Sequence, residues 1–172
     1  METQIRPIRA EDLTALVVLA QQTYRAAYGH EMDSAALSWH LETYLSRSRL
    51  HEMMQHDVFL LAEQGAQLIG YVQFGATQPT DPPADEVEIR RLYVLPVAQN
   101  QGLGSRLMKA ALAHPQVQAA GRAVLGVWHT NTAAQRFYAR FGFVQIGEQP
   151  YLTQAGDIAG VDLLLCRRQI QD

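Results

Sequence analysis

The stretch RLYVLPVAQNQGLG, residues 91–104, decides how this chain folds. Its first part is rich in apolar, aromatic and β-branched residues and ends at Pro96, which is typical of a strand. Gly102 and Gly104 follow, and an apolar pattern of helical spacing then continues through Ala113. The stretch therefore predicts a strand, a glycine turn and a helix in immediate succession.

A glycine turn between a strand and a helix favours a phosphate ligand. Glycines let backbone N–H groups approach the ligand closely, and the helix N-terminus adds the positive end of its dipole. Two common nucleotide patterns do not fit: the chain has no Gly-x-x-x-x-Gly-Lys-Ser/Thr, and Leu107 stands where a dinucleotide-binding fingerprint needs a small residue. The alternative for Gly102 and Gly104 is a tight turn without a ligand.

The flanking sequence predicts a mixed α+β fold. Apolar residues alternate in the expected strands and recur at i, i+3, i+4 and i+7 in the expected helices. No repeat or linker divides the chain, so we expect a single domain over residues 1–172. The expected strands cover 5–8, 58–63, 67–75, 87–95, 123–128, 143–146 and 161–166, and the expected helices cover 13–28, 34–55 with a break near Arg47, 103–113 and 131–140.

Composition excludes several classes of protein. The 172 residues are 48% apolar and 18% charged with a net charge of −3, which argues against a strongly basic nucleic-acid binder. No apolar run is long enough for a membrane span and the N-terminus lacks a signal pattern, so we expect a cytoplasmic protein. Cys166 is the only cysteine and reads as a core residue. His51 and His56 are spaced wrongly for one helical metal site, so no metal is expected.

A second motif follows about thirty residues after the glycine turn. The run VWHTN, residues 127–131, precedes an aromatic helical face and Gly142. With the glycine turn and the opening IRPIRAED, residues 5–12, it resembles the GCN5-related N-acetyltransferase (GNAT) superfamily over nearly the whole chain. EIRRLYV (88–94), GVW (126–128) and VDLLL (161–165) are similar to the bacterial Pai-type spermine/spermidine acetyltransferases.

The resemblance implies a fold, a cofactor and a reaction. The fold is a mixed, mostly antiparallel central sheet flanked by helices, splayed at a β-bulge into a V-shaped cofactor cleft. The reaction is direct transfer of the acetyl group of acetyl-CoA to a primary amine, without a metal. The resemblance further implies a small cationic acceptor such as spermidine or spermine, and family habit suggests a homodimer.

The resemblance also assigns cofactor-binding residues. The backbone of Tyr93 and Val94 would pair with the pantetheine arm like an added strand, and one N–H there would polarise the thioester carbonyl. The turn would wrap the pyrophosphate, while Asn131 and Tyr138 would contact the cofactor. The residues expected in the turn are Gln99, Asn100, Gln101, Gly102, Leu103, Gly104, Ser105 and Arg106.

Tyr138 and Glu88 are the expected catalytic residues. By resemblance, the Tyr138 hydroxyl protonates the departing thiolate; periodicity alone makes it a core aromatic. Glu88 would deprotonate the ammonium through a water, with Glu86 or water alone as substitutes. Asn131 has a second interpretation as a plain N-cap, and His129 reads as a surface residue or faces the acceptor.

Three other functions stay open. The same chemistry can act on an amino acid, an aminoglycoside or a protein N-terminus. A domain of this fold can also be a non-catalytic acyl-CoA sensor. The glycine turn can belong to an unrelated nucleotide-binding module.

The charges are unevenly distributed along the sequence. Residues 89–140 hold seven cations and no acid, and this stretch spans both motifs. The rest of the chain holds all seventeen acids, including Glu31, Asp33, Glu42, Glu86 and Glu88 around the segments expected to receive the acceptor. The basic stretch would attract the phosphates of coenzyme A, and the acids would suit a cationic acceptor.

Overall fold

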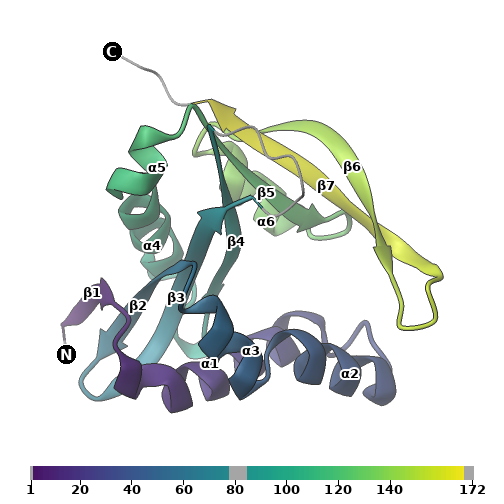
Figure 1. The fold of residues 1–172 in the computed structure, drawn as a ribbon, viewed down its shortest axis with the longest axis horizontal. Helices are drawn as coiled ribbons and strands as arrows, with labels where there is room; N and C mark the ends of the chain where they lie inside the picture. The colour runs from purple at the N-terminus through teal and green to yellow at the C-terminus, as the bar shows by residue number, and fades with distance from the viewer. Residues whose placement is uncertain (1, 78–84, 169–172) are drawn as a thin grey trace. The chain divides into compact units, whose positions relative to one another are not determined.

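The computed structural model describes residues 2–77 and 85–168 (Figure 1). Seven strands form one mostly antiparallel sheet in the order β1-β2-β3-β4-β5-β7-β6, and helices flank it, which confirms the α+β prediction. In chain order the elements are β1 (Thr3–Pro7), the 3₁₀ turn η1 (Ala10–Asp12), α1 (Leu13–Tyr28), α2 (Ser34–Tyr44), α3 (Arg47–Met53), β2 (Val58–Gln64), β3 (Gln67–Ala76), β4 (Glu86–Val94), η2 (Pro96–Ala98), α4 (Leu103–Leu112), α5 (Pro115–Ala119), β5 (Arg122–Trp128), α6 (Thr132–Ala139), β6 (Val144–Leu152) and β7 (Ile158–Arg168).

Residue contacts divide the chain into two compact units. Unit 1 comprises the chain up to Phe74 together with Arg91–Ala113, and unit 2 comprises Gly75–Arg90 together with the chain from His114 onward. Strand β4 therefore gives its first half to unit 2 and its second half to unit 1. The single domain over residues 1–172 stays a prediction.

Unit 1 is built on the β1–β2–β3 meander and the helices beside it. Both strand pairs are antiparallel, and Gly65 (φ 63°) makes the turn between β2 and β3. Helix α1 buries Leu13, Leu16 and Ala20 at helical spacing against strand residues such as Phe59. This apolar layer fixes the face of the sheet on which the helices lie.

A buried ion cluster joins the start of unit 1 to strand β2. The Arg6 guanidinium donates to both carboxylate oxygens of Asp12, at 2.7 and 2.9 Å, and to Glu63 at 2.7 Å. Asp12 also accepts from the backbone N–H of Arg9 at 2.7 Å. These hydrogen bonds, chiefly the one from Arg6, lower the pKa of Asp12.

The helical stretch predicted over residues 34–55 is two helices, α2 and α3. The break falls at Leu45 and Ser46, next to the predicted position of Arg47. Ser46 causes it, because its hydroxyl caps α3 by accepting from the N–H of Arg49 at 3.4 Å. Tyr44 and Met53 are partly buried against the unit 1 core, and Trp39 packs edge-on against Tyr44.

Unit 2 contains the parallel pair of the sheet and a long hairpin. The register of β4 with β5 covers Glu86–Glu88 and Arg122–Val124, and β7 pairs antiparallel with both β5 and β6. The hairpin strands are longer than predicted, since β6 continues to Leu152 and β7 begins at Ile158.

The interior of unit 2 contains the single cysteine. Cys166 lies on β7 and is buried, as the sequence predicts for a core residue. On the same strand, Gly160 sits so close to the Trp128 ring that no side chain would fit between them. In the described ranges, 2–77 and 85–168, no helix has the length and apolar character to cross a membrane.

Candidate active site

The glycine turn lies in unit 1, between strand β4 and helix α4. The chain leaves β4, makes one 3₁₀ turn at Pro96–Ala98, and passes through Asn100 (φ 60°) and Gly102 (φ 77°) before α4 begins. Both residues adopt the left-handed conformation, which glycine and asparagine tolerate best. A Cβ at Gly102 would point into open space, so the turn leaves room beside its backbone.

The N-terminus of α4 offers backbone donors at this turn. Gly102 is the N-cap and provides no capping side chain, while the first intrahelical bond runs from Arg106 N–H to the Gly102 carbonyl at 3.0 Å. The N–H groups of Leu103, Gly104 and Ser105 therefore precede the helical ladder. Together with the helix dipole they suit an anion such as a phosphate.

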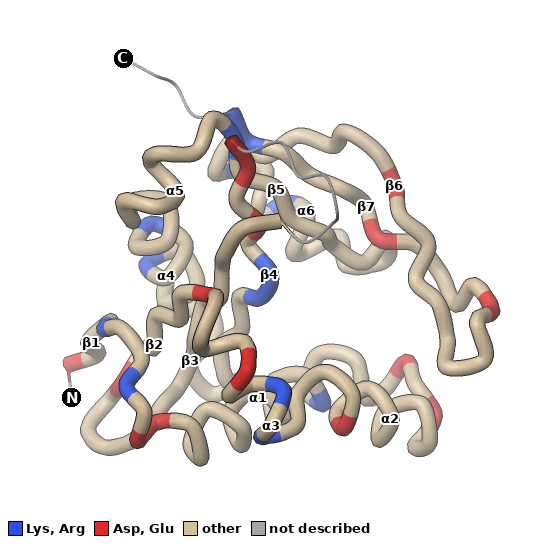
Figure 2. The backbone as a smooth tube through the Cα atoms, viewed as in Figure 1, with Lys and Arg blue, Asp and Glu red and all other residues tan. Residues whose placement is uncertain are grey.

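Several side chains of the turn hold its shape. Gln99 donates to the Val94 carbonyl at 3.0 Å, and Gln101 donates to the Val97 carbonyl at 3.1 Å. The Arg106 guanidinium donates to the Thr3 carbonyl at 2.7 Å, which ties α4 to β1. Figure 2 shows further cationic positions on α4 and β4. The turn thus has side-chain supports, and its backbone donors precede the helical ladder.

The strand before the turn carries the two residues expected to pair with the pantetheine arm. Leu95 N–H binds the Ile69 carbonyl of β3 at 2.9 Å, and Gly70 leaves little room beside the Tyr93 carbonyl. The parallel register with β5 ends at Glu88, so it leaves Tyr93 and Val94 out of that pairing. Desolvation raises the pKa of the Tyr93 hydroxyl well above its ordinary value.

The second motif lies in unit 2 and folds as predicted. Asn131 caps α6 by accepting from the N–H of Ala134 at 3.0 Å, and Gly142 (φ 82°) follows the helix end. This confirms the N-cap interpretation of Asn131, while its contact with the cofactor stays a prediction. The half-buried Tyr138 ring lies 5.2 Å from the Phe137 centroid and 6.0 Å from that of Phe143.

Both candidate bases are ion-paired within unit 2. Glu88 accepts from the Arg90 guanidinium, which also binds the Ala76 carbonyl. Glu86 accepts from Arg122 at 2.5 Å. A cationic acceptor would have to share either carboxylate with an arginine that already neutralises it.

His129 and its neighbours fit the surface interpretation. The side chain is exposed, and its Nδ1 lies 3.1 Å from the Val161 carbonyl. Burial raises the pKa of the nearby Asp162, and His129 opposes that rise. Within the part of the chain that the structure describes, no group of three metal-ligating side chains gathers, and His51 and His56 are no exception.

One buried polar network was not predicted from the sequence. Arg91 donates to the Gln73 side-chain oxygen at 2.7 Å, and the Gln73 amide nitrogen donates to Asp57 at 2.6 Å. All three residues belong to unit 1. A lone arginine on the mostly apolar second half of β4 is the only signal of this network in the sequence, since its partners come from other elements.

The predicted site residues thus fall into two sets. Unit 1 brings together Tyr93, Val94 and the turn 99–106, and unit 2 contains Glu86, Glu88, Asn131 and Tyr138. The first set is a strand end, a left-handed turn and a helix N-terminus whose first N–H groups lack intrahelical acceptors. The second set is an aromatic helix and a pair of carboxylates. Their roles in binding and catalysis stay predictions.

Comparison with known proteins decides the family. The model of the acetyltransferase (GNAT) family matches residues 13–143, which is most of the chain. The chain belongs to the GNAT family. As a GNAT protein it is an acetyl-CoA-dependent N-acetyltransferase, and the resemblance that the two motifs predict is confirmed.

Individual relatives of this GNAT protein act on different compounds, as their names state. It is 26% identical to a phosphinothricin N-acetyltransferase of Streptomyces coelicolor, over 85% of this chain and 84% of the relative. It is 35% identical to a mycothiol acetyltransferase of Acidimicrobium ferrooxidans over 66% of this chain, but spans only 38% of that protein. The PaiA N-acetyltransferase of Thermoplasma acidophilum, solved with coenzyme A, superposes with a TM-score of 0.76 at 20% identity, covering 98% of this chain and 99% of the other.

Proposed function

We propose that this enzyme transfers the acetyl group of acetyl-CoA directly to the nitrogen of a primary amine. The observation that carries the proposal is the turn 99–105, where a left-handed Gly102 leads into α4 and three backbone N–H donors precede the first intrahelical bond. This arrangement suits the pyrophosphate of coenzyme A. Tyr93 and Val94, immediately before the turn, supply backbone groups for the pantetheine arm and the thioester carbonyl.

The reaction exchanges one carbon–sulfur bond for one carbon–nitrogen bond. The neutral amine nitrogen attacks the thioester carbonyl carbon, and a backbone N–H of Tyr93 or Val94 stabilises the charge that develops on the oxygen. The carbon–sulfur bond then breaks, and coenzyme A leaves as a thiolate that takes a proton from the Tyr138 hydroxyl. The proton lost by the amine passes to Glu88, to Glu86 or to water.

The proposed acceptor, from the sequence resemblance, is a small polyamine such as spermidine or spermine. Four of the five acids that motivated this acceptor have structural partners: Glu31 pairs with His30 at 3.4 Å, Asp33 caps α2, and Glu86 and Glu88 pair with arginines. Other amines, including amino acids, aminoglycosides and protein N-termini, therefore belong in the same test.

The test measures binding and turnover with the purified protein. Acetyl-CoA at about 100 times its Kd stabilises a folded protein by about 2.7 kcal/mol, so the melting temperature should rise by several degrees. ATP and NAD should leave it unchanged. Initial rates with spermidine, spermine, amino acids, phosphinothricin and an aminoglycoside then rank the acceptors, with mass spectrometry of the acetylated product.

Each outcome separates the candidates. Turnover on at least one amine supports acetyl transfer, and equal low rates on all polyamines exclude the polyamine acceptor. Acetyl-CoA binding without turnover on any amine indicates a sensor. Stabilisation by ATP or NAD in place of acetyl-CoA indicates another nucleotide-binding module. A homodimer is a further proposal, which sedimentation of the same sample tests.

A further inference from the structure

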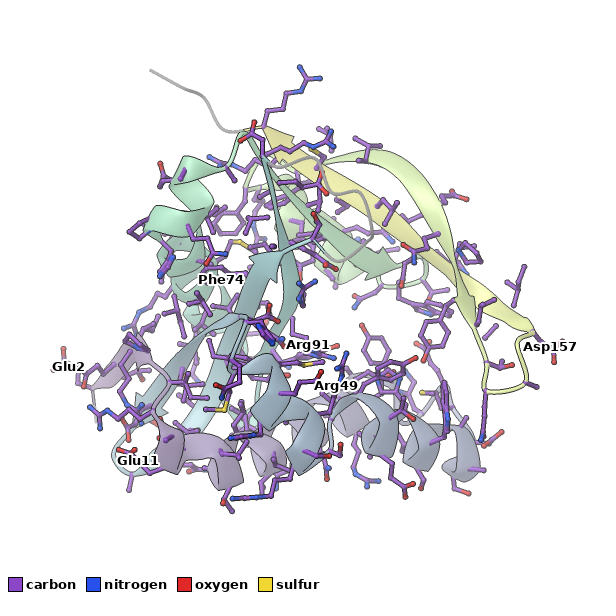
Figure 3. The ribbon with its side chains drawn as sticks, viewed as in Figure 1. Glu2, Glu11, Arg49, Phe74, Arg91 and Asp157 are labelled. Atoms are coloured by element: carbon purple, nitrogen blue, oxygen red, sulfur yellow. The ribbon has the colours of Figure 1, made fainter. Side chains whose placement is uncertain are left out.

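Arg91 occupies an unusual place in unit 1. It lies two residues before Tyr93 on β4, is half-buried, and approaches the Met53 sulfur at 3.4 Å (Figure 3). Its Nη1 donates to the Gln73 side-chain oxygen at 2.7 Å. The guanidinium is therefore fixed at the second half of β4, beside helix α3.

Gln73 holds Arg91 in place without neutralising it. The Gln73 side chain is fully buried, and its amide nitrogen donates to Asp57 at 2.6 Å. Because the carboxylate can only accept, the amide oxygen of Gln73 must face Arg91. The neutral amide of Gln73 therefore lies between the carboxylate of Asp57 and the guanidinium of Arg91, which do not bond to each other directly.

Within the described residues, no carboxylate forms an ion pair with Arg91. Elsewhere in the described ranges Arg6, Arg49, Arg90 and Arg122 each pair with a carboxylate. Arg91 pairs with none among residues 2–77 and 85–168, and its side chain bonds there to Gln73 and Met53. A partly buried guanidinium without an acid favours an anionic ligand, since it presents several donors in one plane.

Two titratable groups on which Arg91 acts electrostatically, Tyr71 and His40, are neutral at neutral pH. The Tyr71 hydroxyl is buried without a hydrogen-bond partner in the described part of the chain, and an unsatisfied buried hydroxyl costs folding free energy. Burial raises the pKa of Tyr71 to about 12 against the effect of Arg91, so the hydroxyl keeps its proton. Burial, with a smaller effect of Arg91, lowers the pKa of His40 to about 4, so its ring adds no charge at neutral pH.

We propose that Arg91 binds a carboxylate of the acceptor, so that the preferred substrate carries both a primary amine and a carboxylate, as an amino acid or a short peptide does. The inference rests on the proposed acetyl transfer. Arg91 and Tyr93 are two residues apart on one strand, about 7 Å, which a small bifunctional acceptor spans. On this inference a carboxylate-bearing amine takes the place of the polyamine that the sequence resemblance implies, because an all-cationic polyamine would meet the Arg91 guanidinium with like charge.

The test compares acceptors that differ only at the carboxylate. Each amino acid is assayed beside its carboxamide, which keeps the amine and removes the negative charge, and spermidine is included. A charge-assisted hydrogen bond corresponds to a roughly ten- to hundredfold preference in kcat/KM for the carboxylate. Arg91→Gln should abolish this preference mainly through KM, so that the ratio of kcat/KM for each amino acid to that for its carboxamide falls to about one.

Arg49→Gln is the matched control, because Arg49 is an exposed arginine on α3 that pairs with Glu52 at 2.6 Å. It should keep the wild-type preference. Acetyl-CoA titration by calorimetry checks that each variant is folded and binds the cofactor. Calorimetry with coenzyme A and an N-acetyl amino acid, compared with its N-acetyl carboxamide, measures the same preference without turnover.

The outcomes distinguish this inference from the proposed function. If the carboxamides or spermidine equal the carboxylates, or if the preference survives in Arg91→Gln, the assignment of Arg91 is wrong and acetyl transfer stands. If no amine is acetylated, the proposed function fails, and the calorimetric preference alone decides the role of Arg91. A preference that appears in both measurements and disappears in Arg91→Gln supports the site.

Discussion

Tyr138 lies near the end of α6, where its ring packs between two other aromatic residues, Phe137 and Phe143. Its ring packs edge-on against Phe137 and faces Phe143 across 6.0 Å. Such packing restricts the ring to a narrow range of orientations, which is what a group that must deliver one proton requires.

Replacing Tyr138 by Phe removes that proton and keeps the ring. We expect kcat to fall by about 10² to 10⁴, the usual contribution of a positioned acid, while acetyl-CoA affinity changes little. Steady-state kinetics and a calorimetric titration measure the two effects. Tyr151→Phe, on β6 of the same unit, is the control and should keep wild-type kcat. An unchanged kcat in Tyr138→Phe would remove this residue from the acid role.

Local side-chain roles could be predicted from the sequence, and distant ones could not. Asn131 caps the residue three positions ahead, so spacing alone reveals it. Gln73 meets Asp57 and Arg91 across sixteen and eighteen residues. Their meeting depends on the register of β3 and on the end of α3, which no local pattern specifies. The sequence therefore shows an arginine at position 91 but does not reveal that Gln73 and Asp57 hold it in place.

The element with the clearest role is the turn between β4 and α4. Its shape depends on two left-handed residues, Asn100 and Gly102, and on the side chains of Gln99 and Gln101. A strand end followed by glycines predicts this turn directly, because few other residues adopt these backbone angles. That is why the amino-acid sequence alone is enough to locate it.

Gly102→Val tests the turn as a binding element. The valine would strain the left-handed backbone and place a branched side chain in the open space beside the donors. We expect acetyl-CoA binding to weaken beyond detection in a calorimetric titration. Gly156→Val is the matched control, because Gly156 (φ 88°) also faces open space, but in the β6–β7 turn. Gly156→Val should strain its own turn to a similar degree and bind acetyl-CoA with wild-type affinity. Wild-type affinity for acetyl-CoA in Gly102→Val would refute the binding function of the turn.

The β6–β7 hairpin shows where element prediction stops. The predicted strands covered 143–146 and 161–166, whereas the pairing continues to Leu152 and Ile158. The added residues include glycine, proline and one acid, Glu148, which are uncommon in strands. Their strand conformation comes from the register with β7, which is itself held by β5. Tertiary pairing thus extended these strands beyond the local signal.

At the scale of the whole molecule, two ionisable groups make stability depend on pH. The folded pKa of His40 is about 4, below its ordinary 6.5, so the unfolded chain binds more protons between those values. Stability should therefore fall as the pH drops from about 6.5 toward 4. The pKa of Asp12 is lower in the folded protein than its ordinary value of 3.8. Its contribution to the free energy of unfolding is therefore complete above pH 3.8 and is lost as the pH falls through the pKa of the folded state.

Urea unfolding at a series of pH values between 7 and 3 measures this dependence. His40→Gln should flatten the upper part of the curve and leave the loss below pH 4 in place. His30→Gln, at an exposed position, should reproduce the wild-type curve. An identical slope between pH 6.5 and 4 in wild type and His40→Gln would contradict the inferred state of His40.

The solitary thiol of Cys166 has a practical consequence. Each acetyl transfer releases one new sulfhydryl group, that of coenzyme A, and the only protein sulfhydryl is buried on β7. A chromogenic thiol reagent added to the native enzyme should therefore report turnover continuously with almost no background from the protein. Rates with different acceptors can then be read in a plate spectrophotometer, without labelled cofactor.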